Sequence, residues 1–231
     1  MTAAPTEISA SRPADSLEVR WIIRGLLMTE MREWFSRFPA KMEVRTDAYL
    51  LHPHTAGLSV KLRDGARMDV KSYLGSPGVI DLPRRCRGRL ESWRKWSFKC
   101  DPAATRDVPP AGWSVVRKRR HRSWFPLGAA GCMAELTQAY VSGEAWWSLG
   151  FEATGPASLL RGALDRAAGL LFAQPLPAGT ELGLDSSRSY LDWLTEAGRD
   201  DGSAAGGTGG ALRSLNAMPS RISSSAMPPR M

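Results

Sequence analysis

Polar and apolar residues alternate one by one along much of the first two thirds of the chain, which is the pattern of β-strands with one apolar and one polar face. The clearest case is LSVKLR at 58–63, followed by Asp64-Gly65, a favoured tight-turn pair, and then by further alternation. The pattern predicts a β-hairpin over 58–71 whose polar face carries Lys61, Arg63 and Lys71. That face is either a solvated surface or a basic wall that binds an anion.

The same alternation recurs and predicts eight strands in all, at 17–24, 42–51, 58–63, 68–71, 89–98, 113–120, 132–141 and 145–153. The Gly- and Pro-containing segments at 75–85, 101–112 and 121–131 are predicted to be loops. Most of these strands have one aliphatic or aromatic face and one face that mixes Lys/Arg with Glu. Trp93 and Trp146 share the charged faces, where either could line a ligand site. Eight strands with mostly short antiparallel connections are enough to close a barrel.

Apolar residues spaced by three and four predict helices at 28–38, 157–172 and 187–197, with Thr29 as the N-cap of the first and Pro39 as its end. Helices that cover the aliphatic strand faces would leave the charged faces lining an interior. The predicted fold is therefore α+β: an eight-stranded antiparallel barrel with a charged lumen and helices packed outside. Charges in an interior need partners, and a polyanion with a divalent cation would satisfy both signs.

Composition divides the chain into three parts. Residues 1–15 are expected to be a disordered lead-in, 16–197 the barrel domain with its C-terminal helices, and 198–231 a disordered tail with six glycines between 198 and 210. No long apolar run predicts a membrane span, and the first residues do not have the pattern of a secretory signal. Three cysteines without CxxC spacing argue against a disulfide framework and a cysteine zinc site, which favours a cytoplasmic location.

Positive charge is concentrated in one region. Of the net charge of +8, residues 84–122 alone contribute +10, from 13 Lys/Arg and three acids. Such a region predicts a phosphate-bearing partner, either a phosphorylated small molecule or polyphosphate or a nucleic acid. The chain has no P-loop, Rossmann, nucleophile-elbow or HExxH motif, so the corresponding enzyme classes are excluded.

The order of the charged motifs resembles that of the CYTH superfamily, the triphosphate tunnel metalloenzymes. Short motifs that resemble those of the family follow one another along residues 17–153: Glu18-Val19-Arg20 for ExExK, Asp47-Ala48-Tyr49 for DxY, Leu58 to Arg63 for LRxR, Val70-Lys71 for the strand that ends in lysine, Arg89-Leu90-Glu91 for RxE, Val116 to Arg120 for the basic strand, and Glu135 and Glu152 for the late acids. The resemblance implies an eight-stranded tunnel that binds a triphosphate, polyphosphate or organic phosphate.

The resemblance also implies roles for individual residues. The phosphate-binding set would be Arg20, Lys61, Arg63, Lys71, Lys95, Lys118 and Arg120, and the ligands of Mg or Mn would be Glu18, Glu91, Glu135 and Glu152. Metal would assist the attack of water on a terminal phosphate. Two departures weaken the metal site: Arg20 replaces the second acid of the first motif, and Glu152 has no second acid two residues away.

Three hypotheses about function remain open at this point. The first is a metal-dependent phosphohydrolase, in which the acids hold metal rather than pairing with the lumen bases. The second is a non-catalytic barrel that binds a phosphorylated small molecule or another polyanion. The third is a nucleic-acid binder that uses the basic run 117–122 with Trp113 and Trp124 nearby. No membrane partner is expected, and the sequence does not give the oligomeric state.

Overall fold

The computed structural model describes residues 11–52, 57–83, 86–101, 105 and 112–204. Eight strands and three helices follow one another in the order β1 Ala14–Arg24, α1 Thr29–Phe35, β2 Lys41–Leu50, β3 Leu58–Arg63, β4 Arg67–Leu82, β5 Cys86–Lys99, β6 Trp113–Leu127, β7 Ala130–Val141, β8 Glu144–Thr154, α2 Ala157–Phe172 and α3 Tyr190–Ala204. None of the helices in this part of the chain has the length and apolarity needed to span a bilayer.

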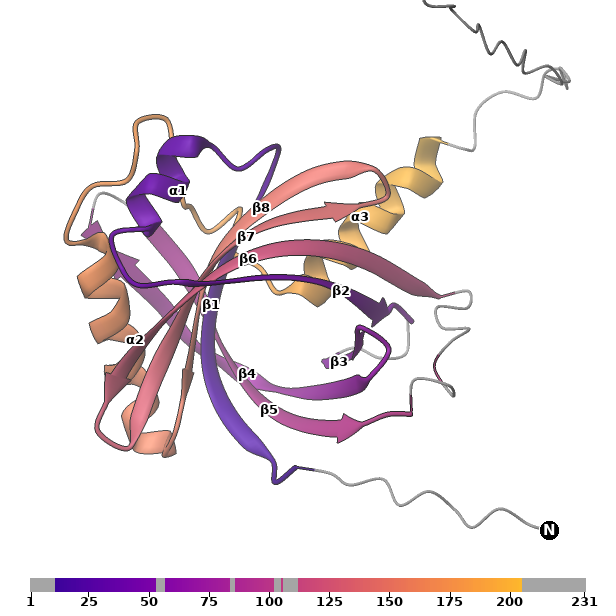
Figure 1. Ribbon diagram of the computed structural model, residues 1–231, viewed down its shortest axis with the longest axis horizontal. Coiled ribbons are helices and arrows are strands. Elements are labelled where there is room, and N and C mark those ends of the chain that lie inside the picture. The colour runs from indigo at the N-terminus through magenta and orange to yellow at the C-terminus, as the bar shows by residue number, and fades with distance from the viewer. Residues whose placement is uncertain (1–10, 53–56, 84–85, 102–104, 106–111, 205–231) are drawn as a thin grey trace, which may run out of the picture.

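The strands form one closed antiparallel barrel with the order β1-β5-β4-β3-β2-β6-β7-β8 (Figure 1). Neighbours in sequence pair along β2-β3, β3-β4, β4-β5, β6-β7 and β7-β8, and the ring closes where β1 pairs with both β5 and β8. The predicted α+β barrel is confirmed. Because side chains alternate between the two faces of a strand, each strand turns one set of side chains toward the lumen and the other toward the outside.

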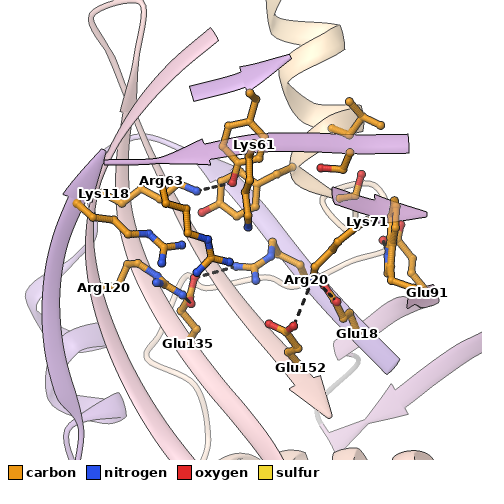
Figure 2. Close-up of a pocket in the computed structure, with 17 residues that line it drawn as sticks. Glu18, Arg20, Lys61, Arg63, Lys71, Glu91, Lys118, Arg120, Glu135 and Glu152 are labelled. Carbon is orange, nitrogen blue, oxygen red and sulfur yellow. Dashed lines mark hydrogen bonds and ion pairs between the residues drawn. The ribbon is translucent and has the colours of Figure 1, made fainter. Parts of the chain in front are cut away.

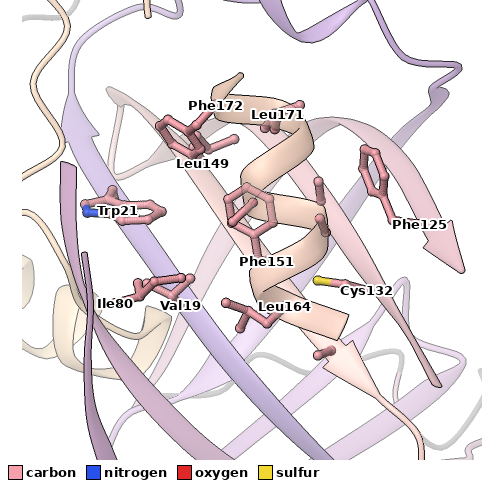
Figure 3. Packing of buried hydrophobic residues seen from close by; sticks show 14 of the residues in the cluster. Val19, Trp21, Ile80, Phe125, Cys132, Leu149, Phe151, Leu164, Leu171 and Phe172 are labelled. Atoms are coloured by element: carbon pink, nitrogen blue, oxygen red, sulfur yellow. The ribbon is translucent and has the colours of Figure 1, made fainter. Parts of the chain in front are cut away.

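The main hydrophobic core lies outside the barrel, between its wall and the helices. Helix α2 crosses the outer faces of β1, β7 and β8, as Figure 3 shows for Val19, Leu149, Phe151 and Leu164. These side chains are 1% exposed or less. The α1 residues Met31, Trp34 and Phe35 belong to the same cluster. Burial of these apolar faces fixes which face of each strand is left to line the lumen.

The prediction for the first helix needs correction at both ends. Helix α1 begins at Thr29, so the predicted N-cap Thr29 is the first helical residue, and the N-cap position is taken by Met28 without a side-chain hydrogen bond. The helix ends at Phe35, before the predicted stop at Pro39. The Thr29 hydroxyl instead accepts a hydrogen bond from the Arg32 guanidinium. Helix α2 has the predicted bounds, 157–172.

Strand β4 is longer than the sequence pattern indicates. The segment from Gly75 onward, predicted to be a loop, continues the strand to Leu82 and pairs with β5. Register shifts occur around Gly75 and Gly78, which have φ of 126° and 112°. The glycines and the intervening proline therefore form irregularities within a strand, where the extra residues are accommodated by conformations that glycine adopts easily. Similarly, β6 runs on to Leu127 instead of ending at 120.

Helix α3 differs from the other two in its position. Its Tyr190, Trp193 and Leu194 pack against Ile22 and Val116, residues on the polar-face register of β1 and β6, so α3 fills one end of the lumen (Figure 1). Strand β1 begins within the segment predicted as lead-in, and α3 continues to 204, beyond the predicted boundary at 197. The rest of the predicted disordered ends, 1–10 and 205–231, lies outside the described residues.

Candidate functional site

The lumen is lined by the charged residues that the alternation pattern singled out. Of the predicted set, Glu18, Arg20, Lys61, Arg63, Lys71, Glu91, Lys118, Arg120, Glu135 and Glu152 all face one cavity, together with Arg45, Tyr49, Ser59 and Trp93 from the strands and Ser189, Tyr190 and Leu191 from the α3 end (Figure 2). Lys95 does not line the cavity, and its Nζ lies 3.8 Å from Glu152 Oε1. Seven basic side chains thus face four carboxyl groups.

Glu135 of β7 is held between two arginines. Arg20 Nη1 lies 3.3 Å from Glu135 Oε1, and Arg120 forms an ion pair with the other carboxylate oxygen. Thr137 Oγ1 donates a further hydrogen bond of 2.9 Å to Oε1. Burial opposes ionisation of this carboxyl, but Arg120 and Arg20 hold its pKa well below its usual range. Glu135 is therefore a permanent anion that positions two guanidinium groups.

Glu18 of β1 and Glu152 of β8 converge on the ammonium of Lys71. Lys71 Nζ lies 2.5 Å from Glu18 Oε1 and 3.4 Å from Glu152 Oε1. Lys71 is the main cause that lowers the pKa of Glu152, and although burial works against it, the two carboxylates raise the pKa of Lys71. Glu152 and Lys71 are therefore both charged at neutral pH.

Glu91 of β5 is different, because among the described residues it has no ion-pair partner. Its Oε2 accepts a hydrogen bond of 3.0 Å from Trp93 Nε1. Burial, with smaller contributions from Asp192 and Glu18, raises the pKa of Glu91 to about 7. A carboxyl group with this pKa can accept or release a proton near neutral pH.

Lys118 of β6 is enclosed by acids and aromatic rings. Its Nζ donates to Asp47 Oδ2 at 2.8 Å and to the Tyr49 hydroxyl at 2.6 Å, and it lies 3.8 Å from the centroid of the Tyr190 ring. Asp47 is fully buried and also binds Arg45. Lys118, Arg45 and Asp47 thus form one buried network at the wall of the lumen.

Lys61 of β3 has no carboxylate partner among the described residues, although its neighbours on the lumen wall do. Arg63, two residues along the strand, forms an ion pair with the fully buried Asp69. Burial and the positive charge of Arg63 hold the pKa of Lys61 well below its usual value. The environment of Lys61 is thus electrostatically unsatisfied, and a bound anion would relieve it.

Sequence reasoning did not include several residues of the site. Asp69 lies in the predicted hairpin and Arg45 in the predicted strand 42–51, but neither was assigned a role. Tyr190 lies in the predicted helix 187–197 and was not assigned a role in the lumen. Asp69 and Arg45 could have been found from the alternation, because they share the polar face of their strands with Lys71 and Asp47. Nothing in the helical pattern of 187–197 indicates that Tyr190 reaches the lumen.

Comparison with known proteins gives matches of fold only. No protein-family model and no curated protein matches the chain. Among solved structures, it is similar to the putative adenylyl cyclase HpAC1 from Hippeastrum, described as having a dominant triphosphatase activity, with a TM-score of 0.45 and 12% identity over 80% of this chain and 96% of that chain. It is also similar to the PH1012 protein of Pyrococcus horikoshii OT3, with a TM-score of 0.42 and 16% identity over 76% of this chain and 98% of that one.

Similarity at this level does not indicate an activity. The fold is identified instead from the strand order and from the charged residues that line the lumen. The chain folds as a closed antiparallel tunnel barrel with a charged lumen. Its closed ring of eight antiparallel strands, with the predicted acids and bases inside, is the architecture that the motif order implied. The role of each lumen residue in this tunnel barrel remains a prediction.

A divalent metal does not fit the lumen of the tunnel barrel as it is arranged. Hard cations such as Mg²⁺ and Mn²⁺ need several oxygen ligands that converge on one point. Among the described residues, no group of three or more acidic, histidine or cysteine side chains could hold a metal ion. Glu18 and Glu152 do converge, but on the Lys71 ammonium, and Glu135 is engaged by Arg20 and Arg120.

The basic run 117–122 is divided between the two faces of the barrel wall. Lys118 and Arg120 point into the lumen, whereas Arg117 and Arg119 are exposed on the outside. Arg122 forms an ion pair with Glu43 at 3.2 Å. The run is therefore not one continuous basic surface.

Proposed function

We propose that the barrel binds a triphosphate, a short polyphosphate or an organic phosphate in its lumen. The proposal depends above all on the excess of basic side chains over carboxyl groups in the lining of the lumen. Lys61 matters most among them, because it has no carboxylate partner among the described residues. Seven basic side chains and four carboxyl groups line the cavity, and the six bases other than Lys61 each pair with a carboxylate of the lumen or of its wall. A polyanion in contact with Lys61, Arg63 and Lys118 would balance this excess, and charge-assisted hydrogen bonds to phosphate oxygens are strong in such an environment.

Isothermal titration calorimetry with sodium tripolyphosphate tests the binding. We expect Lys61→Met to weaken tripolyphosphate binding by about tenfold or more, because it removes the lumen cation that has no carboxylate partner among the described residues. Arg119→Met is the matched control, since it removes one positive charge from the outer face of β6. An equal loss of tripolyphosphate affinity in both variants would indicate a general effect of net charge and contradict binding in the lumen.

A more specific form of the proposal is that the protein hydrolyses the phosphate compound that it binds. A hydrolase needs a group that activates water, and Glu91 is the lumen carboxyl that has no ion-pair partner within the described part of the chain and has a pKa of about 7. The surrounding bases would stabilise the charge that develops on the transferred phosphoryl group. Phosphate release from tripolyphosphate and ATP, measured with EDTA, Mg and Mn for the wild type and Glu91→Gln, tests this form. Binding without release from any substrate would leave a non-catalytic receptor.

Nucleic-acid binding remains the second candidate, and the exposed pair Arg117 and Arg119 favours it. Neither has an acidic partner among the described residues, and both lie on the outer face of β6 beside Tyr140. Retention of a single-stranded oligonucleotide that is lost in Arg117→Met/Arg119→Met, with a steep dependence on salt, would support this candidate. Retention unchanged in that variant would contradict it.

A further inference from the structure

Two basic side chains occupy the part of the lumen where carboxylates converge. The first is Lys71, whose ammonium is shared by Glu18 and Glu152 (Figure 2). These carboxylates come from two paired strands, β1 and β8, in which residues 18 and 152 are direct partners. Two carboxylate oxygens from neighbouring strands that meet at one cation are the beginning of a divalent-metal site. Here the cation at the meeting point belongs to the protein.

The second is Arg20, and the chain makes space for it. Residue 20 is the direct partner of Gly150, which is also the partner of Glu135 on the other side. A Cβ atom at position 150 would lie 2.9 Å from the Arg20 Cζ atom. The guanidinium thus lies over the glycine, and from there it binds Glu135 and lies 4.8 Å from the Tyr190 ring centroid. A larger residue at position 150, acidic or not, would compete for this space.

Together Lys71 and Arg20 bring two unit positive charges, which is the charge of one Mg²⁺ ion. A divalent ion would have to approach both cations and would find the oxygens of Glu18, Glu152 and Glu135 already engaged. Repulsion between cations is strong in a lumen of low effective dielectric constant. The arrangement therefore opposes metal binding, both by charge and by the loss of free ligands.

We infer that Lys71 and Arg20 substitute for a divalent metal, so that the lumen binds its phosphate ligand without one. This inference rests on the proposed function for the identity of the ligand, but the exclusion of metal stands on the geometry alone. It predicts that the two cations, and not a dissociable ion, provide the central positive charge of the site.

The first arm of the test measures Mn²⁺ binding by the loss of the free-ion electron paramagnetic resonance signal, with no phosphate present. The wild type is expected to bind no stoichiometric Mn²⁺. Lys71→Met releases Glu18 and Glu152 toward each other and is expected to bind one Mn²⁺ at least about tenfold more tightly than the wild type. The matched control is Lys61→Met, which removes a lumen cation that has no carboxylate partner among the described residues. This variant is expected to bind no more Mn²⁺ than the wild type. Circular dichroism melting verifies that each variant is folded.

The second arm compares the affinity of the wild type for tripolyphosphate in EDTA and in a slight excess of Mg or Mn. Affinities that agree within about threefold would support the inference. Stoichiometric Mn²⁺ binding by the wild type, or tripolyphosphate binding that requires metal, would overturn it and leave the proposed function intact. A folded Lys71→Met that gains no Mn²⁺ would also overturn it. Absence of tripolyphosphate binding under every condition would instead refute the proposed function, while the Mn²⁺ arm would still decide the exclusion of metal.

Discussion

Tyr190 of α3 stacks on Tyr49 of β2, with ring centroids 5.6 Å apart and ring planes 13° apart. Both rings also contact Lys118, whose ammonium lies 4.7 Å from one centroid and 3.8 Å from the other. A cation against two aromatic faces is stabilised by their electron-rich surfaces. Helix α3 is thereby joined to a charged residue inside the barrel.

Replacement of Tyr190 by alanine tests this link. Tyr190→Ala is expected to lower the free energy of unfolding by about 2 kcal/mol, because it removes the stacked pair and one face of the Lys118 site. Urea unfolding followed by circular dichroism measures the change. Tyr140→Ala, at an exposed position on β7, is the control and is expected to change stability by less than about 0.5 kcal/mol. A similar cost for both variants would show that α3 is not joined to the lumen through Tyr190.

Lys61 is expected to reduce stability while it supports binding. Its pKa is lowered in the folded protein, so the unfolded chain binds this proton more readily, and stability falls as the pH drops below the usual lysine range. Lys61→Met is therefore expected to raise the free energy of unfolding at pH 7 by about 1 kcal/mol, although it weakens tripolyphosphate binding. The same substitution at the exposed Lys99 should change neither quantity. A destabilised Lys61→Met protein would contradict the assignment.

Glu91 is expected to make stability depend on pH near neutrality. Burial raises its pKa to about 7, so between the usual value near 4.5 and 7 the folded state holds a proton that the unfolded chain releases. The contribution of Glu91 to stability thus declines as the pH rises through this window. In Glu91→Gln this decline should disappear, with a melting temperature about 2–4 °C above that of the wild type at pH 8. Parallel curves of melting temperature against pH for the two proteins would contradict the prediction that Glu91 causes the decline in stability.

Gly150 is expected to matter for binding more than for stability. The Cβ of Gly150→Ala would displace the end of the Arg20 side chain, which can move at a cost below about 1 kcal/mol but would then be misplaced relative to Glu135. Tripolyphosphate affinity should fall by about tenfold. Gly169→Ala, on the exposed side of α2 with nothing within 4 Å of the new Cβ, should leave affinity unchanged and add about 1 kcal/mol of stability. Unchanged affinity in Gly150→Ala would rule out the role given to Arg20.

The lumen face of each strand could be predicted from the sequence because the alternation of side chains has a period of two. The reasoning that assigned Lys61 and Arg63 to a polar strand face also assigned Lys118 and Arg120 to one, and the structure places all four along the same cavity. The pattern failed at Gly75 to Leu82, where glycines and a proline interrupt the alternation although the backbone continues to pair with β5. Local propensity there is overridden by the hydrogen bonds available from the neighbouring strand.

The partners of the lumen residues could not be predicted. The resemblance assigned Glu18 and Glu152 to metal, whereas the structure pairs both with Lys71. A strand pattern indicates which face a side chain occupies, but the choice of partner depends on barrel register and tilt, which bring β1, β4 and β8 together. For the same reason the sequence showed that residue 20 is basic, but not that Gly150 gives it space.

The packing of α3 against the barrel gives the cavity a floor as well as walls. Trp193 and Leu194 fill that end with apolar side chains, which cannot replace the water around a phosphate. A linear phosphate chain would therefore enter by its terminus, and its interior units would stay in solvent. For such a ligand, the fraction of protein with an occupied lumen would depend on the concentration of chain ends. Cutting one long phosphate chain into many short ones would therefore create new ligands for the lumen without adding any phosphate.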